Sequence, residues 1–195
     1  MILIFTGNGK GKTTAALGQM MRALGRGKSA LMIQFIKGPW RSGEDEFAER
    51  SKFQVPSSKF RVPPKHPAAA GATGQASFKI VKMGKGFVGI LGDKLPREEH
   101  IKAAEKGLEF FSEEEKSDKW DLIALDEINV AVSLGLLSVQ RVLAAIKDFP
   151  QDKILILTGR DAPKEFIDIA DLATEMKEIK HPFGEGEKAK PGIEF

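Results

Sequence analysis

One glycine-rich stretch near the start of this 195-residue chain decides the fold, and it reads Thr6-Gly7-Asn8-Gly9-Lys10-Gly11-Lys12-Thr13-Thr14. It follows the apolar run Ile2–Phe5 and precedes an amphipathic stretch that stops at Gly25, so it predicts a strand, a tight loop and a helix. The stretch matches the phosphate-binding pattern G-x-x-x-x-G-K-[ST], except that Thr6 stands in place of the first glycine.

The residue types in this loop suit a polyphosphate. Glycines let the backbone turn so that its N–H groups point inward at phosphate oxygens, and the following helix adds its positive N-terminal end. Lys12 supplies a point charge, Thr13 a hydroxyl for Mg²⁺, and Lys10 a second charge. The alternative is a glycine-rich turn that binds no nucleotide, which the flanking strand and helix disfavour.

Short apolar runs alternate with helical patterns along the rest of the chain. We expect strands at Ile2–Thr6, Ala30–Phe35, Phe78–Met83, Leu122–Asp126, Ile154–Thr158 and Ala173–Ile179, and helices at Thr13–Leu24, Pro96–Lys116, Val139–Phe149 and Pro163–Leu172. Several of these strands are apolar on both faces, as in buried parallel sheets. The pattern therefore predicts an α/β protein of the phosphate-loop NTPase type, with a mostly parallel, doubly wound sheet flanked by helices in a single domain over residues 1–195.

Two acids follow the apolar run Leu122–Leu125, and their position resembles the second motif of phosphate-loop ATPases, in which a carboxylate holds Mg²⁺. Adjacent residues on a strand point apart, so we expect only one of Asp126 and Glu127 to face the metal directly. The alternative is that the pair begins a helix. Because ligands bind beyond the carboxyl ends of parallel strands, one edge should gather the segments Thr6–Thr14, Gln34–Gly38, Gly84–Gly92, Asp126–Asn129 and Thr158–Asp161.

A second glycine pattern, G-x-G-x-x-G, spans Gly84–Gly89 and resembles the dinucleotide fingerprint. That fingerprint requires a helix to begin inside the motif, but here the helix begins only near Pro96. We therefore interpret this segment as a flexible loop of the active site.

Composition narrows the function. The absence of cysteine excludes disulfides, cysteine-ligated metals and a cysteine nucleophile. The three histidines, His66, His100 and His181, are scattered, and we expect each to lie on the surface or in a loop. The short apolar start is unlike a signal peptide and no apolar run could span a bilayer, so we expect a cytoplasmic protein without a membrane partner.

The formal net charge of +3 is too small to indicate nucleic-acid binding, but the charge is uneven. Eight basic and no acidic residues lie between Arg50 and Gly92, so this stretch either meets a polyanion or is a solvated loop. It includes a proline- and alanine-rich segment at about 53–77 that is unusually long for a loop in a compact domain. We interpret the segment as an insertion, either a surface loop or a lid that docks a partner.

Taken together, the motifs resemble one family over nearly the whole chain except residues 53–77. They are the phosphate loop, Gln34–Gly38, Leu125-Asp126-Glu127, Leu157–Arg160 and the tail segments Lys188–Lys190 and Gly192–Phe195. The family is the phosphate-loop type of cob(I)alamin adenosyltransferase. The resemblance implies that cobalt(I) of a reduced corrinoid attacks C5′ of ATP and expels triphosphate, so the enzyme needs no general base.

The resemblance also assigns roles to residues. It implies that ATP lies reversed on the loop and is bound by Thr6, Gly7, Asn8, Gly9, Lys10, Gly11, Lys12, Thr13, Thr14 and Arg160. Mg²⁺ or Mn²⁺ would be served by Thr13, Asp126 and Glu127, the catalytic residues would be Lys12 and Glu127, and Phe87 with Gly86 and Gly89 would face the corrinoid. Phe87 would help to exclude the lower ligand of cobalt; two residues further on, where some relatives carry Trp, this chain has Gly89.

The family further implies a homodimer and an electron donor such as a reduced flavoprotein. Two other functions remain open from the sequence. One is a phosphoryl transferase such as a nucleoside kinase, and the other is a non-catalytic nucleotide-binding switch.

Overall fold

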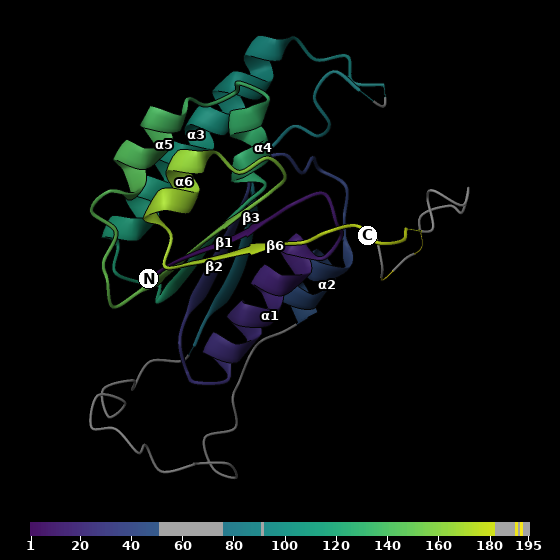
Figure 1. Cartoon of the computed structure of the whole chain (residues 1–195). Helices are drawn as coiled ribbons and strands as arrows, with labels where there is room; N and C mark the ends of the chain where they lie inside the picture. The colour runs from purple at the N-terminus through teal and green to yellow at the C-terminus, as the bar shows by residue number, and fades with distance from the viewer. Residues whose placement is uncertain (51–75, 91, 182–189, 191, 193–195) are drawn as a thin grey trace.

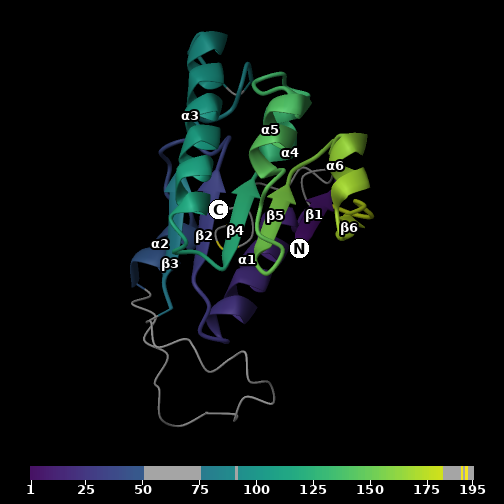
Figure 2. The ribbon, with the colours of Figure 1, turned by 90° about the vertical axis from the view of Figure 1, so that its left-hand side faces the viewer.

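The computed structural model describes residues 1–50, 76–90, 92–181, 190 and 192. Its described residues form one six-stranded sheet in the order β3-β2-β4-β5-β1-β6. All five strand pairings are parallel, and Figure 2 shows the central strands running in one direction. The strands are β1 (Ile2–Thr6), β2 (Ala30–Gln34), β3 (Phe78–Lys82), β4 (Leu122–Asp126), β5 (Ile154–Thr158) and β6 (Leu172–Glu175).

Helices cover both faces of the sheet, as the doubly wound prediction requires (Figure 1). The helices are α1 (Lys12–Leu24), α2 (Gly43–Arg50), α3 (Arg97–Lys116), α4 (Ile128–Ser133), α5 (Val139–Ile146) and α6 (Lys164–Ile169). Helices α1 and α2 lie on one face and the other four on the opposite face. Among the described residues, no helix is both long and apolar enough to cross a membrane.

Successive strand residues supply the two layers of core. Leu3, Met32 and Ala124 pack with Met20 and Leu24 of α1, whereas the next residue of each strand turns to the other face. There, Ile4, Ile33 and Leu125 join a larger core with Phe111 of α3 and Phe166 of α6. This alternation follows from the period-two geometry of strands, and it explains why the buried strands are apolar on both faces.

The sequence located all six strands, but it missed two helices. Helix α2 is short and begins at a capping arrangement, in which Asp45 Oδ2 accepts hydrogen bonds from the Ser42 amide (2.7 Å) and hydroxyl (2.8 Å). Helix α4 is six residues long and rich in β-branched residues, which disfavour helix, so tertiary packing must hold it. Two predicted bounds near the end of the chain were also wrong, because α6 ends at Ile169, before Leu172, and β6 stops at Glu175.

The predicted insertion at 53–77 lies almost wholly outside the described residues. Of the eight basic residues in this stretch, Arg50, Lys79, Lys82 and Lys85 are described, and the Lys85 side chain is exposed. The Lys79 ammonium lies 5.7 Å from the Phe110 ring centroid, and Lys82 forms an ion pair with Asp45. Lys79 and Lys82 therefore contact other parts of the protein, which a fully solvated loop would not predict.

Candidate functional site

The phosphate loop connects β1 to α1, and Lys12 donates hydrogen bonds back to two of its carbonyl oxygens. Lys12 is the first residue of α1 and is only 7% exposed. Its Nζ donates to the carbonyl oxygens of Gly7 (2.9 Å) and Gly9 (2.7 Å). Burial lowers the pKa of Lys12, while the nearby carboxylate of Glu127 acts in the opposite direction. The ammonium is thus held at the centre of the loop.

The edge strand β6 fixes the outer side of the loop. The Gly9 amide donates to the Met176 carbonyl oxygen at 2.6 Å, and the Met176 amide donates to the Thr6 carbonyl at 2.8 Å. A Cβ added at Gly7 or Gly9 would lie 2.5 or 2.7 Å from the Met176 carbonyl oxygen. These glycines are therefore required by close backbone approach, which the phosphate-loop pattern alone does not reveal.

This contact gives a paired stability prediction. We expect Gly9→Ala to lower the free energy of unfolding by about 1–3 kcal/mol, the scale of an overpacked site. Gly18→Ala, in the middle of α1 with no atom within 4 Å of the added Cβ, should raise it by about 0.5–1 kcal/mol. Urea denaturation of both variants is the measurement, and a Gly9→Ala variant as stable as Gly18→Ala would contradict the close contact.

Asp126 is the polar centre of the site. It is fully buried at the end of β4. Its Oδ1 accepts from the hydroxyls of Thr13 (2.9 Å) and Thr158 (2.8 Å), and its Oδ2 accepts from Gln34 Nε2 (3.1 Å). These partners come from α1, β5 and β2, so the carboxylate joins three elements behind the loop.

Glu127 is the first residue after β4 and the N-cap of α4, with a left-handed backbone (φ 61°). The structure therefore combines the two alternatives of the sequence, since the acid pair ends a strand and also begins a helix. The Glu127 amide donates to Thr158 Oγ1 at 2.9 Å. Burial, together with the charge of Asp126, raises the pKa of Glu127 to about 7.

This raised pKa predicts how stability depends on pH. A carboxyl with a pKa near 4.5 when unfolded and about 7 when folded disfavours the folded state progressively as the pH rises through that window. We expect Glu127→Gln to gain on the order of 1–3 kcal/mol of stability over the parent between pH 5 and pH 8. Denaturant titrations without added metal measure the gain, with exposed Glu109→Gln as control, and a gain that is flat with pH would contradict it.

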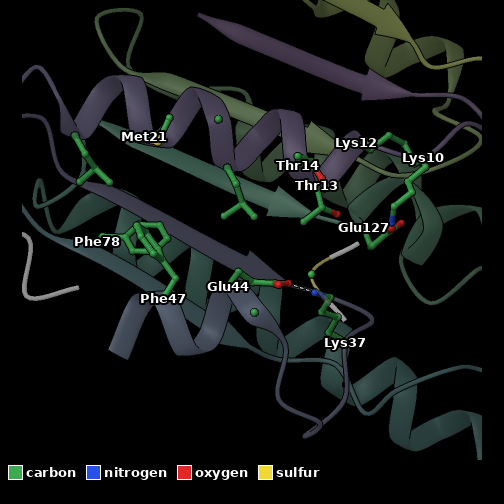
Figure 3. Close-up of a pocket in the computed structure, with 16 residues that line it drawn as sticks. Lys10, Lys12, Thr13, Thr14, Met21, Lys37, Glu44, Phe47, Phe78 and Glu127 are labelled. Carbon is green, nitrogen blue, oxygen red and sulfur yellow. Dashed lines mark hydrogen bonds and ion pairs between the residues drawn. The ribbon is translucent and has the colours of Figure 1, made fainter. Parts of the chain in front are cut away.

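A groove of about 640 Å³ runs between α1 and α2 and begins at the phosphate loop. In Figure 3, Lys12, Thr13 and Glu127 lie at one end, with Lys37 and Glu44, which form an ion pair, across from them. The other end is apolar, and it is lined by Leu17, Met21, Leu24, Phe47 and Phe78. The groove thus offers a cationic end for phosphates beside an apolar end.

The loop after β3 closes the same edge of the sheet. Asp93 Oδ2 accepts from the Gly89 amide (2.8 Å) and lies 3.0 Å from His100 Nε2. His100 is 3% exposed on α3, so the prediction that it lies on the surface or in a loop was wrong. The Gly89 and Leu95 amides, with His100, lower the pKa of Asp93. This anchor holds the segment in a defined shape.

Comparisons with known proteins give the family of the chain. The family model described as "ATP:corrinoid adenosyltransferase BtuR/CobO/CobP" matches residues 1–195. The chain belongs to this corrinoid adenosyltransferase family. The corrinoid adenosyltransferase CobA of Salmonella typhimurium is 33% identical to it, in an alignment that covers 100% of this chain and 85% of the relative. The corrinoid adenosyltransferases of Pseudomonas aeruginosa (34%, covering 100% and 83%) and Escherichia coli K12 (31%, covering 100% and 85%) are similar in the same way.

Membership confirms the predicted family, the phosphate-loop α/β fold and a transferase that uses ATP and a corrinoid as substrates. The kinase and the non-catalytic switch are not favoured. The phosphate loop lies beside Asp126, which bonds to Thr13, and beside Glu127, which lines the same groove. Arg160 lies near enough to influence the pKa values of Lys12 and Glu127.

Two predicted ATP-binding residues of the adenosyltransferase loop, Thr6 and Asn8, do not line the main groove. Thr6 Oγ1 accepts from the Ala162 amide at 3.2 Å and so braces the loop after β5. Asn8 lies outside the main groove and lines a second hollow with Arg160.

The sequence placed the segments Gln34–Gly38 and Thr158–Asp161 at this edge but gave no role to three of their residues, namely Gln34, Lys37 and Thr158. Gln34 and Thr158 bind Asp126, and Lys37 lines the groove. Burial lowers the pKa of Lys37, and Asp126 opposes this shift. The signal for all three was their place at or just beyond the ends of β2 and β5, where parallel strands present ligand-binding groups.

The donor set of the site suits a hard cation. Among the described residues, no three His, Cys, Asp or Glu side chains cluster as a complete metal cage. The Thr13 hydroxyl and the Asp126 carboxylate, however, meet at 2.9 Å at the mouth of the loop, and Gln34 Oε1 lies buried beside them without a hydrogen-bond partner. Oxygen donors of this kind, completed by phosphate and water, fit Mg²⁺, which is usually bound by few protein ligands.

Proposed function

We propose that this chain transfers the 5′-deoxyadenosyl group of ATP to cobalt(I) of a reduced corrinoid. Cobalt donates an electron pair to C5′ to form the cobalt–carbon bond, and the C5′–O bond breaks with its pair leaving on triphosphate. The observation that carries the proposal is the groove of about 640 Å³ that begins at the Lys12 loop in a member of the corrinoid adenosyltransferase family.

The residues at the polar end of the groove stabilise the leaving group. Lys12 Nζ, held by two loop carbonyls, turns to the phosphate oxygens, and the amides of Gly7 to Thr13 surround them. Lys37 adds charge from the opposite wall. Such preorganised donors, aimed where charge develops, are commonly the largest contribution to catalysis. Because the cobalt(I) nucleophile is already strong, a general base is not required.

Mg²⁺ or Mn²⁺ would be held by Thr13 and Asp126, and when bound it neutralises charge that accumulates on the triphosphate. Glu127 is one residue further on and faces the groove, where it balances the charge of Lys12. We infer that Asp126 binds the cation directly or through water. Glu127 does not bind it and instead balances the charge of Lys12.

Phe87, with Gly86 and Gly89, faces the corrinoid in this proposal. Phe87 is 48% exposed and lies on the loop anchored by Asp93 and His100. A homodimer, a reduced flavoprotein as the electron donor and a cytoplasmic location stay predictions of the family resemblance.

The test is anaerobic incubation of the protein with ATP, Mg²⁺ and chemically reduced cobalamin. We expect a light-sensitive adenosylcobalamin spectrum and one triphosphate for each cobalt alkylated. Formation of ADP instead would indicate phosphoryl transfer, and the absence of both products would sink the proposal. Omitting Mg²⁺ in a parallel reaction tests the cation separately.

A further inference from the structure

Two exposed aromatic side chains meet at the edge of the sheet that carries the site. Trp40 is 63% exposed and Phe87 is 48% exposed. Their ring centroids are 6.2 Å apart and the rings are inclined by 33°. They come from different loops, one after β2 and one after β3, so only the folded chain forms the pair.

The two loops are joined to each other beyond the ends of their strands. The Gln34 carbonyl accepts from the amides of Met83 (2.9 Å) and Gly84 (3.1 Å), and the Ile36 carbonyl accepts from the Gly86 amide (2.9 Å). A Cβ at Gly84 would lie 2.4 Å from the Ile36 carbonyl carbon. The loops therefore form one layer, and the aromatic rings stand on a common support.

Glycines make the seat of the indole. A Cβ added at Gly38 would lie 2.6 Å from Trp40 Cζ3, and one at Gly86 would lie 2.8 Å from Trp40 Cη2. The Trp40 carbonyl also accepts a hydrogen bond from Lys82, which pairs with Asp45. The indole is thus placed by close backbone contact although most of its surface is open to solvent.

The same loop links the pair to the nucleotide groove. Lys37 lines that groove and pairs with Glu44, whereas Trp40, three residues later, lies against Phe87. The pair is therefore joined through this short loop to a residue that lines the groove. Its chemistry is also particular, because a phenyl ring has no lone pair to offer a metal and the indole N–H is only a donor. Such a surface can pack on a flat macrocycle and keep water and bases from it, but it cannot coordinate the metal.

We propose that Trp40 is a positioning residue that joins Phe87 in packing on the lower face of the corrin ring, where it keeps the lower ligand away from cobalt. This inference rests on the proposed function. Gly89, on the same loop as Phe87, has a left-handed φ of +69° and no atom within 4 Å of its Cβ position, so no second ring stands there. Trp40 supplies the second ring from the other loop.

The test is the EPR spectrum of cob(II)alamin bound to the protein with Mg²⁺ and ATP, since the nitrogen of the lower base splits the cobalt lines. We expect this nitrogen splitting to be reduced when cob(II)alamin binds the parent protein and to be retained with Trp40→Ala. Trp40→Phe should reduce the splitting in part. Trp120→Phe, which alters a buried tryptophan, is the matched control and should behave as the parent. Loss of the splitting in Trp40→Ala to the same extent as in the parent would overturn the inference.

Kinetics separate this inference from the proposed function. Cobinamide has no tethered lower base, so Trp40→Ala should lower kcat at least 10-fold with cobalamin and less than 3-fold with cobinamide. The affinity for ATP should be unchanged, which shows that the loop and groove stay folded. Equal losses with both corrinoids would refute the inference while leaving the activity in place, whereas a parent protein inactive on both would refute the proposed function itself.

Discussion

Lys12→Ala should weaken the binding of ATP by about 1.5–3 kcal/mol, the scale of a hydrogen bond to a charged group. This is roughly 10- to 150-fold in the dissociation constant. We expect adenosyl transfer to fall by at least the same factor, because Lys12 is buried at the centre of the loop and no other described ammonium contacts the Gly7 and Gly9 carbonyls. Equilibrium binding of ATP and turnover with reduced cobalamin are the measurements.

Lys10→Ala is the matched control for the lysine. Lys10 belongs to the same loop and also lines the groove, but it is exposed. Exposed charges are screened by water and salt, so its loss should cost much less than that of Lys12. Equal losses in the two variants would mean that the loop needs only positive charge and that the position of Lys12 has no special role.

Asp126→Asn should remove most of the advantage that Mg²⁺ gives to ATP binding while preserving the fold. The asparagine can keep accepting from Thr13 and Thr158 through its carbonyl oxygen. Its new amide would face Gln34 Nε2, but a flip of the Gln34 side chain would turn the buried and unpartnered Oε1 toward it. The variant thus exchanges a charge for an amide in a pocket that can rearrange.

We expect the Mg²⁺-dependent gain in affinity to fall on the order of 10- to 100-fold, the scale for groups that ligate or orient metal ligands. Titrations of ATP with and without Mg²⁺ measure it. Asp121→Asn provides the control, because this carboxylate accepts from the Ser29 amide at 2.8 Å just before the start of β4, away from the site. A Mg²⁺ effect that is retained in Asp126→Asn would contradict the assignment of Asp126.

The sequence predicted the sheet well because each strand is indicated by residues that are neighbours in the sequence. Six short apolar runs and the loop from Thr6 to Thr14 specify strands and a nucleotide site through residue types and spacing alone. Helix α2 had a weaker local signal, the cap formed by Ser42 and Asp45. It is short and precedes a segment of unusual composition, so the helix was not predicted. The signal for helix α4 was the acid pair Asp126-Glu127 at its start, but its β-branched residues favour a strand, and packing against β5 holds the helix.

The contacts that finish the site join distant parts of the chain, so spacing could not reveal them. Asp126 was predicted as a carboxylate near a metal, but its partners Gln34 and Thr158 required the strand order to be known. His100 was interpreted as a surface or loop residue because nothing nearby in sequence indicated burial. The meeting of Trp40 with Phe87 depends on the pairing of β2 with β3.

The contact between Gly9 and Met176 has a consequence for how the protein is made. The loop is encoded within the first 14 residues, but the carbonyl that closes it belongs to residue 176, just beyond the edge strand β6. During synthesis the early residues leave the ribosome long before this strand, and domains generally complete folding as units. We therefore expect the loop to reach its final shape only near the end of translation, and a product that stops before Leu172 to lack this closing contact.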